Sequence, residues 1–252
     1  ATIKYILKNF LYIFPFALLP ALFLSFSLDK TAIHTLLTNY FTGNPTAIFT
    51  DIFHAVSIFN FRSVGVFFAG LIGVVLMILC ASLMTALMEK HMRIGKRTFN
   101  GVFSKLNDNL MSTCGICLLY VFIYEIWALI MSSLLFLVSL IGSKAAIYVL
   151  SVIVFLGMHF ILLYIVSIFY LWLPCLQITG FRAFEALRYS YQLVAPVKPR
   201  IIFGQLFSML VAEVLLGVAA VFIPGKIAAI VIAAILYAFM TLMFCVRMQV
   251  IY

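Results

Sequence analysis

Six long apolar stretches dominate this chain, and most of its charged residues lie in the segments between them. A helix of about 20 mainly apolar residues is long enough to cross the hydrocarbon core of a bilayer. None of the stretches alternates apolar and polar residues, so helices are expected and the strands of a barrel are not. The sequence therefore predicts six transmembrane helices, over residues 10–28, 63–88, 110–141, 145–174, 201–222 and 227–247.

The composition excludes a water-soluble protein, because 66% of the 252 residues are apolar and only 9% are charged. Such a chain has too few polar side chains to cover a surface that faces water. We expect an all-α polytopic membrane protein that forms one membrane domain over residues 1–252. The first stretch is expected to be a retained span, since it is longer than the ~7–15 apolar residues typical of a cleaved signal.

The net charge of +9 is explained better by membrane orientation than by binding to nucleic acid. If the N-terminus lies inside, twelve of the sixteen Lys and Arg residues fall in inner segments and four in outer ones. Cytoplasmic segments of membrane proteins carry such an excess of positive charge. We therefore expect both termini to be cytoplasmic, and we expect no nucleic-acid partner.

A short pattern occurs twice in the long inner segments, at an offset of 85 residues. Residues 95–102 read Gly-Lys-Arg-Thr-Phe-Asn-Gly-Val, and residues 180–187 read Gly-Phe-Arg-Ala-Phe-Glu-Ala-Leu. Each copy begins a basic stretch with apolar residues at helical spacing, as in a helix that lies in the membrane interface. We call these stretches elbows. The residues expected to act there are Arg97, Phe99, Arg182, Phe184, Glu185, Arg188 and Ser190.

Residues 3–10 resemble a third, shorter elbow. The chain would then comprise three units of elbow and hairpin, over residues 1–88, 89–174 and 175–252. The alternative is that no repeat exists, because inner loops of membrane proteins are commonly basic and amphipathic.

The outer connection over residues 29–62 is long and rich in phenylalanine, so an interfacial helix is expected there, with a lid over a pathway as the alternative. Small residues at four-residue spacing over 65–73 and 204–212 predict close packing between helices. Pro15 and Pro20 predict a kink or freed carbonyl groups in the first span.

Three ionisable residues, Glu125, His159 and Glu213, lie near the centres of the third, fourth and fifth predicted spans. A charged group there costs about 2.5–3.5 kcal/mol, so such residues usually face the bundle interior and pair with one another. One hypothesis is an inward-facing cluster that binds a proton, a cation or a polar group of a substrate. The alternative is that these side chains only join helices by hydrogen bonds. Residues that could line the same space are Tyr120, Tyr124, Ser132, Tyr164 and Ser167.

Signatures of catalysis, of cofactors and of metal sites are absent from the sequence. It contains no phosphate-binding loop, no paired acidic motif and no His-Glu-x-x-His. Cys114 and Cys117 have the spacing of a redox or metal motif, but no second pair of ligands accompanies them. We expect a protein that is not an enzyme, has no cofactor or metal, and keeps its five cysteines as thiols.

The end of the fourth stretch and the elbow after it resemble a recurrent bacterial pattern. Trp172-Leu-Pro174 is followed by Ala183-Phe-Glu185-Ala-Leu-Arg188-Tyr-Ser190. This pattern is similar to that of the YciC-like membrane proteins and of the membrane domain fused to some glycerophosphoryl diester phosphodiesterases. The resemblance implies six helices in a bacterial cytoplasmic membrane but no activity, since the hydrolase chemistry of the fused members sits in a separate domain. Gln177 stands where the family often has an acidic residue.

The length and the six spans also resemble the permease subunits of drug and bacitracin exporters of the ABC type. In that family, residues 89–106 would form a coupling helix that docks a separate ATPase. We therefore expect a protein that transports or organises a lipidic or amphipathic solute, with an exporter permease and a membrane scaffold as alternatives. The expected partners are membrane lipids, another membrane subunit or a cytoplasmic ATPase.

Overall fold

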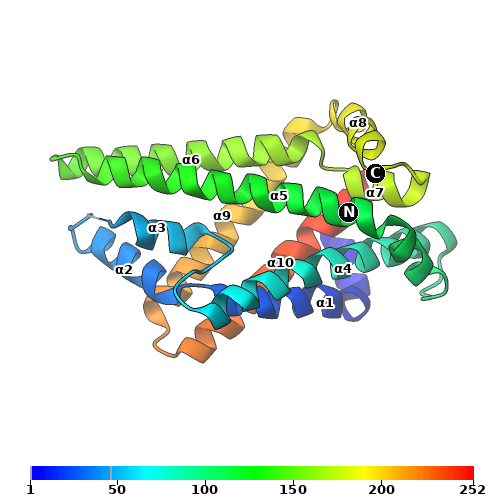
Figure 1. Ribbon diagram of the computed structural model, residues 1–252, viewed down its shortest axis with the longest axis horizontal. Coiled ribbons are helices and arrows are strands. Elements are labelled where there is room, and N and C mark those ends of the chain that lie inside the picture. Colours follow the sequence, from blue (N-terminus) through cyan, green and yellow to red (C-terminus); the bar gives the residue numbers. More distant parts are fainter. Residues whose placement is uncertain (1, 46) are drawn as a thin grey trace.

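The computed structural model describes residues 2–45 and 47–252. Helices are the only regular elements within these residues. They are α1 (Thr2–Ser27), α2 (Lys30–Phe41), α3 (Phe49–Val56), α4 (Val64–Ile94), α5 (Val102–Ser139), α6 (Lys144–Ile168), α7 (Trp172–Thr179), α8 (Ala183–Val194), α9 (Lys198–Phe222) and α10 (Lys226–Ile251). The all-α prediction is confirmed (Figure 1).

Six helical segments within the described residues are long and apolar enough to cross a membrane. They are α1, α4, α5, α6 together with α7, α9 and α10, and they coincide with the six predicted stretches. With 38 residues, α5 is about 57 Å long, nearly twice the ~30 Å of a hydrocarbon core. The hairpin of α5 and α6 must therefore tilt or extend beyond the core at one end.

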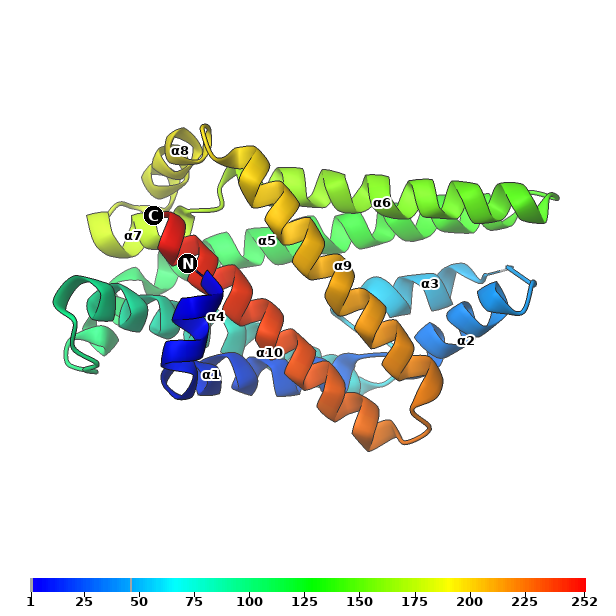
Figure 2. The same cartoon turned by 180° about the vertical axis from the view of Figure 1, so that it is seen from behind.

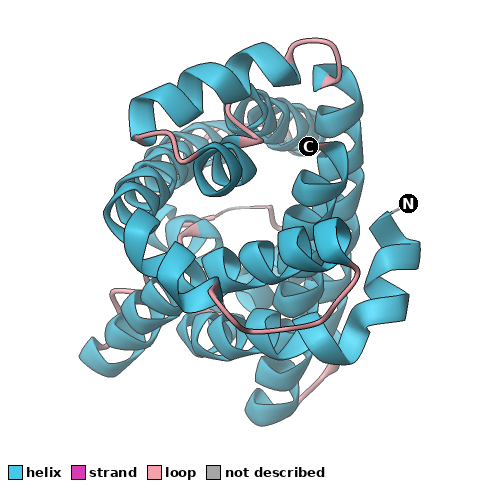
Figure 3. Ribbon diagram, turned by 90° about the vertical axis from the view of Figure 1, so that its right-hand side faces the viewer, coloured by secondary structure: helices cyan, strands magenta, loops and turns pink. Residues whose placement is uncertain are grey.

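The spanning helices close into a ring. Helix α4 contacts α5, α5 contacts α6, α6 contacts α9, α9 contacts α10, and α10 returns to α4. Figure 3 views this ring close to end-on. Helix α1 packs along both α4 and α10 and has the most extensive contacts of any helix (Figure 2). Both chain ends, the loop before α5, and helices α7 and α8 lie at one end of the ring (Figures 1 and 2). The predicted inner basic segments therefore gather at one end, while the predicted cytoplasmic location of that end remains a prediction.

Helix α1 is broken near its start and not at its prolines. Asn9 alone has non-helical backbone angles inside α1, at φ −119° and ψ 18°, whereas Pro15 and Pro20 lie within the continuing helix. The side-chain amide of Asn9 donates to the Tyr5 carbonyl oxygen at 3.0 Å and so gives that oxygen a hydrogen-bond partner at the break. Residues 2–8 form a short helical segment that turns away from the rest of α1 (Figure 2).

The first residue of each copy of the repeated pattern is a glycine with the same structural role, which is to end a helix. Gly95 ends α4 and Gly180 ends α7, both in the left-handed conformation, with φ of +75° and +70°. Glycine adopts this conformation without a steric penalty, which explains its place at helix ends. The copies then diverge. The second leads into the separate helix α8, whereas residues 96–101 form a loop and residues 102–110 continue directly into α5. The expectation of a separate elbow helix in the first copy is therefore wrong.

The outer segment folds into two helices that pack against the ring. Helix α2 contacts α9, and α3 contacts α5 and runs beside it (Figure 1). Arg62 forms ion pairs with Asp29 and Asp51, which ties the two ends of the segment together. Tyr40 and Tyr148 each donate their hydroxyl to the other's carbonyl, at 3.1 and 2.7 Å, and so join α2 to α6. Residues 29–45 and 47–62 are thus part of the helix packing, and they form two helices in place of a single interfacial one.

One of the small-residue patterns marks a close helix contact. A Cβ added at Gly73 would lie 2.8 Å from Leu24 Cγ, so the bare glycine lets α1 approach α4. Gly65, in the same pattern, has open space around it. The prediction of close packing is thus confirmed at Gly73.

Candidate functional site

Helices α6 and α9 bring His159 and Glu213 into direct contact. His159 Nε2 lies 2.8 Å from Glu213 Oε1. The His159 side chain is 1% exposed and the Glu213 side chain is 33% exposed. Glu213 lies in the middle part of α9, so the pair is far from both ends of the helix. The structure therefore joins two of the three ionisable residues that the sequence places near the span centres.

The hydrogen bonds of the imidazole determine where its protons sit. His159 Nδ1 lies 2.7 Å from the Phe155 carbonyl oxygen, which can only accept. Nδ1 must therefore carry a hydrogen, and Nε2 faces the carboxyl group. A hydrogen bond between Nε2 and Oε1 then needs one further proton, which either atom can carry. The pair has the same net charge whichever partner holds this proton.

Aromatic rings fix the orientation of His159. Its ring meets Trp127 edge to face, with centroids 5.1 Å apart, and lies 4.2 Å from the Phe155 ring. The Trp127 indole N–H donates to the Met158 carbonyl at 2.6 Å, which holds α5 against α6 beside the pair. These rings bury the imidazole, and low-dielectric surroundings strengthen a hydrogen bond such as the one between His159 and Glu213.

Two tyrosines from other helices of the ring lie near the Glu213 carboxyl group. Tyr124 of α5 and Tyr237 of α10 both interact electrostatically with Glu213. The second carboxyl oxygen, Glu213 Oε2, is buried and has no hydrogen-bond partner among the described residues. A buried acceptor without a donor is uncommon in folded proteins and calls for an explanation. The Glu213 carboxyl group therefore interacts with groups on α5, α6 and α10, while its Oε2 atom lacks a donor.

Glu125 does not bond to this pair. Its Oε2 accepts from Ser57 Oγ at 2.7 Å and its Oε1 from the Ile58 N–H at 2.9 Å. Both donors belong to the non-helical loop after α3, where backbone groups lack helical partners. The expected three-residue cluster therefore divides into a His159–Glu213 pair and a Glu125 that fastens the outer segment. Tyr124 connects the two parts, because it interacts with both carboxyl groups.

The other residues expected around the cluster serve different contacts. The Tyr124 hydroxyl donates to the Val56 carbonyl at 2.8 Å, and Tyr120 donates to the Phe169 carbonyl at 3.3 Å. Ser132 and Ser167 donate to carbonyl groups of their own helices. Tyr164 lies under the Lys198 ammonium, 3.7 Å from its ring centroid. Only Tyr124 belongs to the site.

The first elbow is fastened to the start of α1. Arg97 donates to the Asn9 side-chain oxygen at 2.8 Å and to the Lys8 carbonyl at 3.4 Å. The Phe99 ring packs against Tyr12, with centroids 5.9 Å apart. The break at Asn9 and the loop before α5 therefore hold each other in place, which the sequence did not indicate.

In the second elbow, Ser190 is the structural anchor. Its buried hydroxyl accepts from the Leu171 N–H at 2.9 Å, at the junction between α6 and α7. Glu185 accepts from the Arg182 N–H at 3.2 Å and caps α8. Phe184 is 87% exposed, and Arg188 is exposed as well. These exposed side chains have the positions expected for interfacial contact, which itself remains a prediction.

No group of three or more His, Cys, Asp or Glu residues that could hold a metal ion occurs in residues 2–45 and 47–252. The five cysteines are free.

Asn9, Trp127 and Tyr237 take part in the contacts above but were not singled out from the sequence. Asn9 could have been found as a polar residue at the start of an apolar run, whereas Trp127 and Tyr237 carry no such signal. A comparison with protein-family models, with curated proteins and with solved structures gives no match.

Proposed function

We propose that this chain is a non-enzymatic integral membrane protein that moves or organises a lipidic or amphipathic solute. The His159–Glu213 pair is the site that holds the polar group of that solute. The observation that carries this proposal is the buried Glu213 Oε2, which has no partner while Oε1 is bonded to His159. A polar residue inside a membrane helix is costly, and it usually serves a pathway or a binding site.

The free acceptor defines the kind of group that would bind. An ammonium or hydroxyl group donates to a carboxyl oxygen, whereas a phosphate group without such a donor beside it would be repelled by the same oxygen. On α9 the neighbours of Glu213 are exposed and apolar, as Val214 is 64% and Leu215 48% exposed. A solute that reaches the pair across this surface would need an apolar part beside its donor group. These features favour an amphipathic solute.

Two other functions weighed from the sequence have less support. The exporter permease would need a coupling helix over residues 89–106, but residues 95–101 form a loop between α4 and α5. A scaffold would need no polar site inside the ring, and it leaves the unpartnered Glu213 oxygen without a reason. Partner subunits and a bacterial cytoplasmic membrane remain part of the proposal on the strength of the sequence resemblance alone.

A lipid-movement assay in vesicles tests the proposal. The purified chain is reconstituted with acyl-labelled fluorescent phosphatidylethanolamine, whose ammonium group is the expected donor. A membrane-impermeant reductant then quenches the label in the outer leaflet, and faster loss of the protected fraction reports movement. We expect Glu213→Gln to slow this movement about tenfold, as for loss of one charge-assisted hydrogen bond. Glu185→Gln removes the same charge from the exposed helix α8 and is the matched control.

The amine probe is compared with acyl-labelled diacylglycerol, which offers a hydroxyl group. Movement of both probes with equal dependence on Glu213 would identify a general donor site. If vesicles with wild-type protein are no faster than empty vesicles, or if Glu213→Gln and His159→Gln both leave the rate unchanged, the proposed site is wrong.

A further inference from the structure

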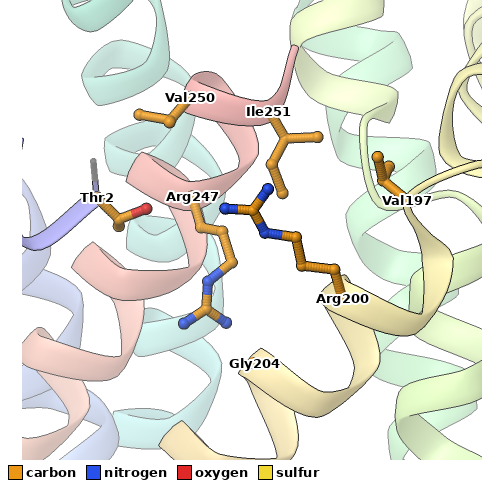
Figure 4. Close-up of a pocket in the computed structure, with 7 residues that line it drawn as sticks. All are labelled: Thr2, Val197, Arg200, Gly204, Arg247, Val250 and Ile251. Atoms are coloured by element: carbon orange, nitrogen blue, oxygen red, sulfur yellow. The ribbon is translucent and has the colours of Figure 1, made fainter.

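A cavity of about 460 Å³ lies between the beginning of α9 and the end of α10, beside the start of α1 (Figure 4). Its volume falls in the range of small-molecule sites, ~300–1,000 Å³. Arg200 of α9 and Arg247 of α10 share this cavity with Thr2 and Gly204. The start of α9 and the end of α10 lie at the end of the ring that holds both termini (Figure 2), and neither His159 nor Glu213 lines the cavity.

Arg247 lies in the cavity wall, where one of its guanidinium nitrogens lacks a hydrogen-bond acceptor. Its Nη2 donates to Ser208 Oγ at 3.2 Å, while Nη1 is buried and has no hydrogen-bond partner among the described residues. A Cβ added at Gly204 would lie 3.1 Å from Nη1. The bare glycine therefore makes the room in which the guanidinium group lies against α9. A buried guanidinium donor without an acceptor is destabilising unless a ligand supplies one.

The two arginines also lack a compensating charge. The cavity lining contains no Asp or Glu, and no ion pair of Arg200 or Arg247 occurs among the described residues. The start of α9 brings a partial positive charge to the cavity and the end of α10 a partial negative one, each about half an elementary charge. The start of α1, at Thr2, adds a second partial positive charge, so the helix ends together reinforce the positive potential of the two guanidinium groups. Figure 4 shows both groups in the space between α9 and α10.

We propose that this cavity binds a phosphate group, held by Arg247 and Arg200 with the Thr2 hydroxyl as a further donor. Guanidinium groups match phosphate oxygens in geometry as well as in charge. Arg247 lies four residues before the end of α10, about 6 Å along the helix axis, which is the depth of lipid headgroups if the helix ends at the interface. Basic pockets between transmembrane helices bind anionic headgroups in this manner. The phosphate belongs either to such a lipid or to a soluble ester. This inference does not rest on the function proposed for Glu213.

Binding is measured by isothermal titration of the purified full chain in a neutral detergent. Three probes are used: short-chain phosphatidylglycerol, a diacylglycerol with the same acyl chains but no phosphate, and inorganic phosphate. We expect saturable binding of one phosphatidylglycerol per chain and none of diacylglycerol. Arg247→Gln and Arg200→Gln should each weaken binding about tenfold, as for one lost charge-assisted hydrogen bond.

Two variants distinguish a specific phosphate site from a general effect of positive charge. Lys226→Gln removes one positive charge from the opposite end of the ring and should leave binding unchanged. Gly204→Ala keeps every charge but shifts the Arg247 guanidinium group by a few tenths of an ångström, and it should weaken binding as well. Arg200 is exposed, so its replacement leaves the packing intact even if Arg247→Gln disturbs it.

The two sources of phosphate give different results. Tight binding of phosphatidylglycerol with weak binding of inorganic phosphate supports a headgroup site, and the reverse supports a site for a soluble phosphate ester. The proposal is overturned if neither probe binds, if diacylglycerol binds as well as phosphatidylglycerol, or if Lys226→Gln weakens binding as much as the two arginine variants do.

Discussion

Replacing Glu125 with alanine should release the loop between α3 and α4. The carboxylate accepts from Ser57 Oγ and from the Ile58 N–H, at 2.7 and 2.9 Å. Its removal leaves the Ile58 amide without an acceptor in a partly buried position. An unsatisfied buried donor costs about 1–3 kcal/mol, and a hydrogen bond to a charged group contributes about 1.5–3 kcal/mol. Because the loop is only partly buried, we expect its opening to become easier by about 2–3 kcal/mol.

Amide hydrogen exchange in detergent measures this opening. A change of about 2–3 kcal/mol corresponds to exchange that is about 30- to 150-fold faster, since ~1.4 kcal/mol is a factor of ten. The increase should be confined to a peptide that covers residues 49–62. The amides of α10, whose helix contacts are with α1, α4 and α9, should exchange as in the wild type.

Two further variants define the mechanism. Tyr124→Phe removes only the donor to the Val56 carbonyl and should have a smaller effect, of about 1 kcal/mol. Ser133→Ala removes a hydroxyl that bonds within α5, to the Leu129 carbonyl, and should change nothing in the loop. Unchanged exchange of residues 57–59 in Glu125→Ala would show that the carboxylate does not hold the outer segment, and our division of the polar cluster would fail.

Three other changes test the helix contacts. Gly73→Val should destabilise the fold by about 1–3 kcal/mol because it overpacks the contact between α1 and α4, whereas a valine at position 65 has open space around it. Thermal unfolding in detergent compares the two variants, and equal unfolding midpoints would contradict the close contact. Arg97→Gln should increase the spread of distances between spin labels on residues 4 and 99, because it frees the elbow from Asn9; an unchanged distribution would argue against that role. Ser190→Ala should destabilise the junction of α6 and α7 by about 1–3 kcal/mol and speed exchange of the Leu171 amide, and exchange at the wild-type rate would exclude the anchor.

Several parts of the structure could be predicted from the sequence because they depend on local composition. The apolar stretches between charged segments predicted the positions of all six long apolar helices. Such a stretch must be helical in lipid, because a helix makes the hydrogen bonds of its backbone within the segment itself. Gly95 and Gly180 could be recognised as equivalent positions from the repeat, and both end a helix in the left-handed conformation. Three ionisable residues near span centres were enough to single out His159 and Glu213.

The path of the outer segment could not be predicted. Its aromatic residues suggested an interfacial helix, because such residues are common at the edge of a membrane. In the structure, Phe53 of α3 packs against the core around Trp127, and the loop after α3 bonds to Glu125. A residue that looks interfacial by composition is equally suited to a buried helix contact, so composition alone does not separate the two.

The sequence by itself determined where the six long apolar helices lie and which ionisable groups are costly to bury. Only the tertiary structure decided that His159 bonds to Glu213 and that Glu125 turns to the outer segment. The physical reason is that a membrane helix is apolar on every side, since lipid and neighbouring helices are equally apolar. The sequence therefore does not indicate which side of each helix faces the ring interior. Packing within the ring sets the rotation of α5, α6 and α9 about their own axes.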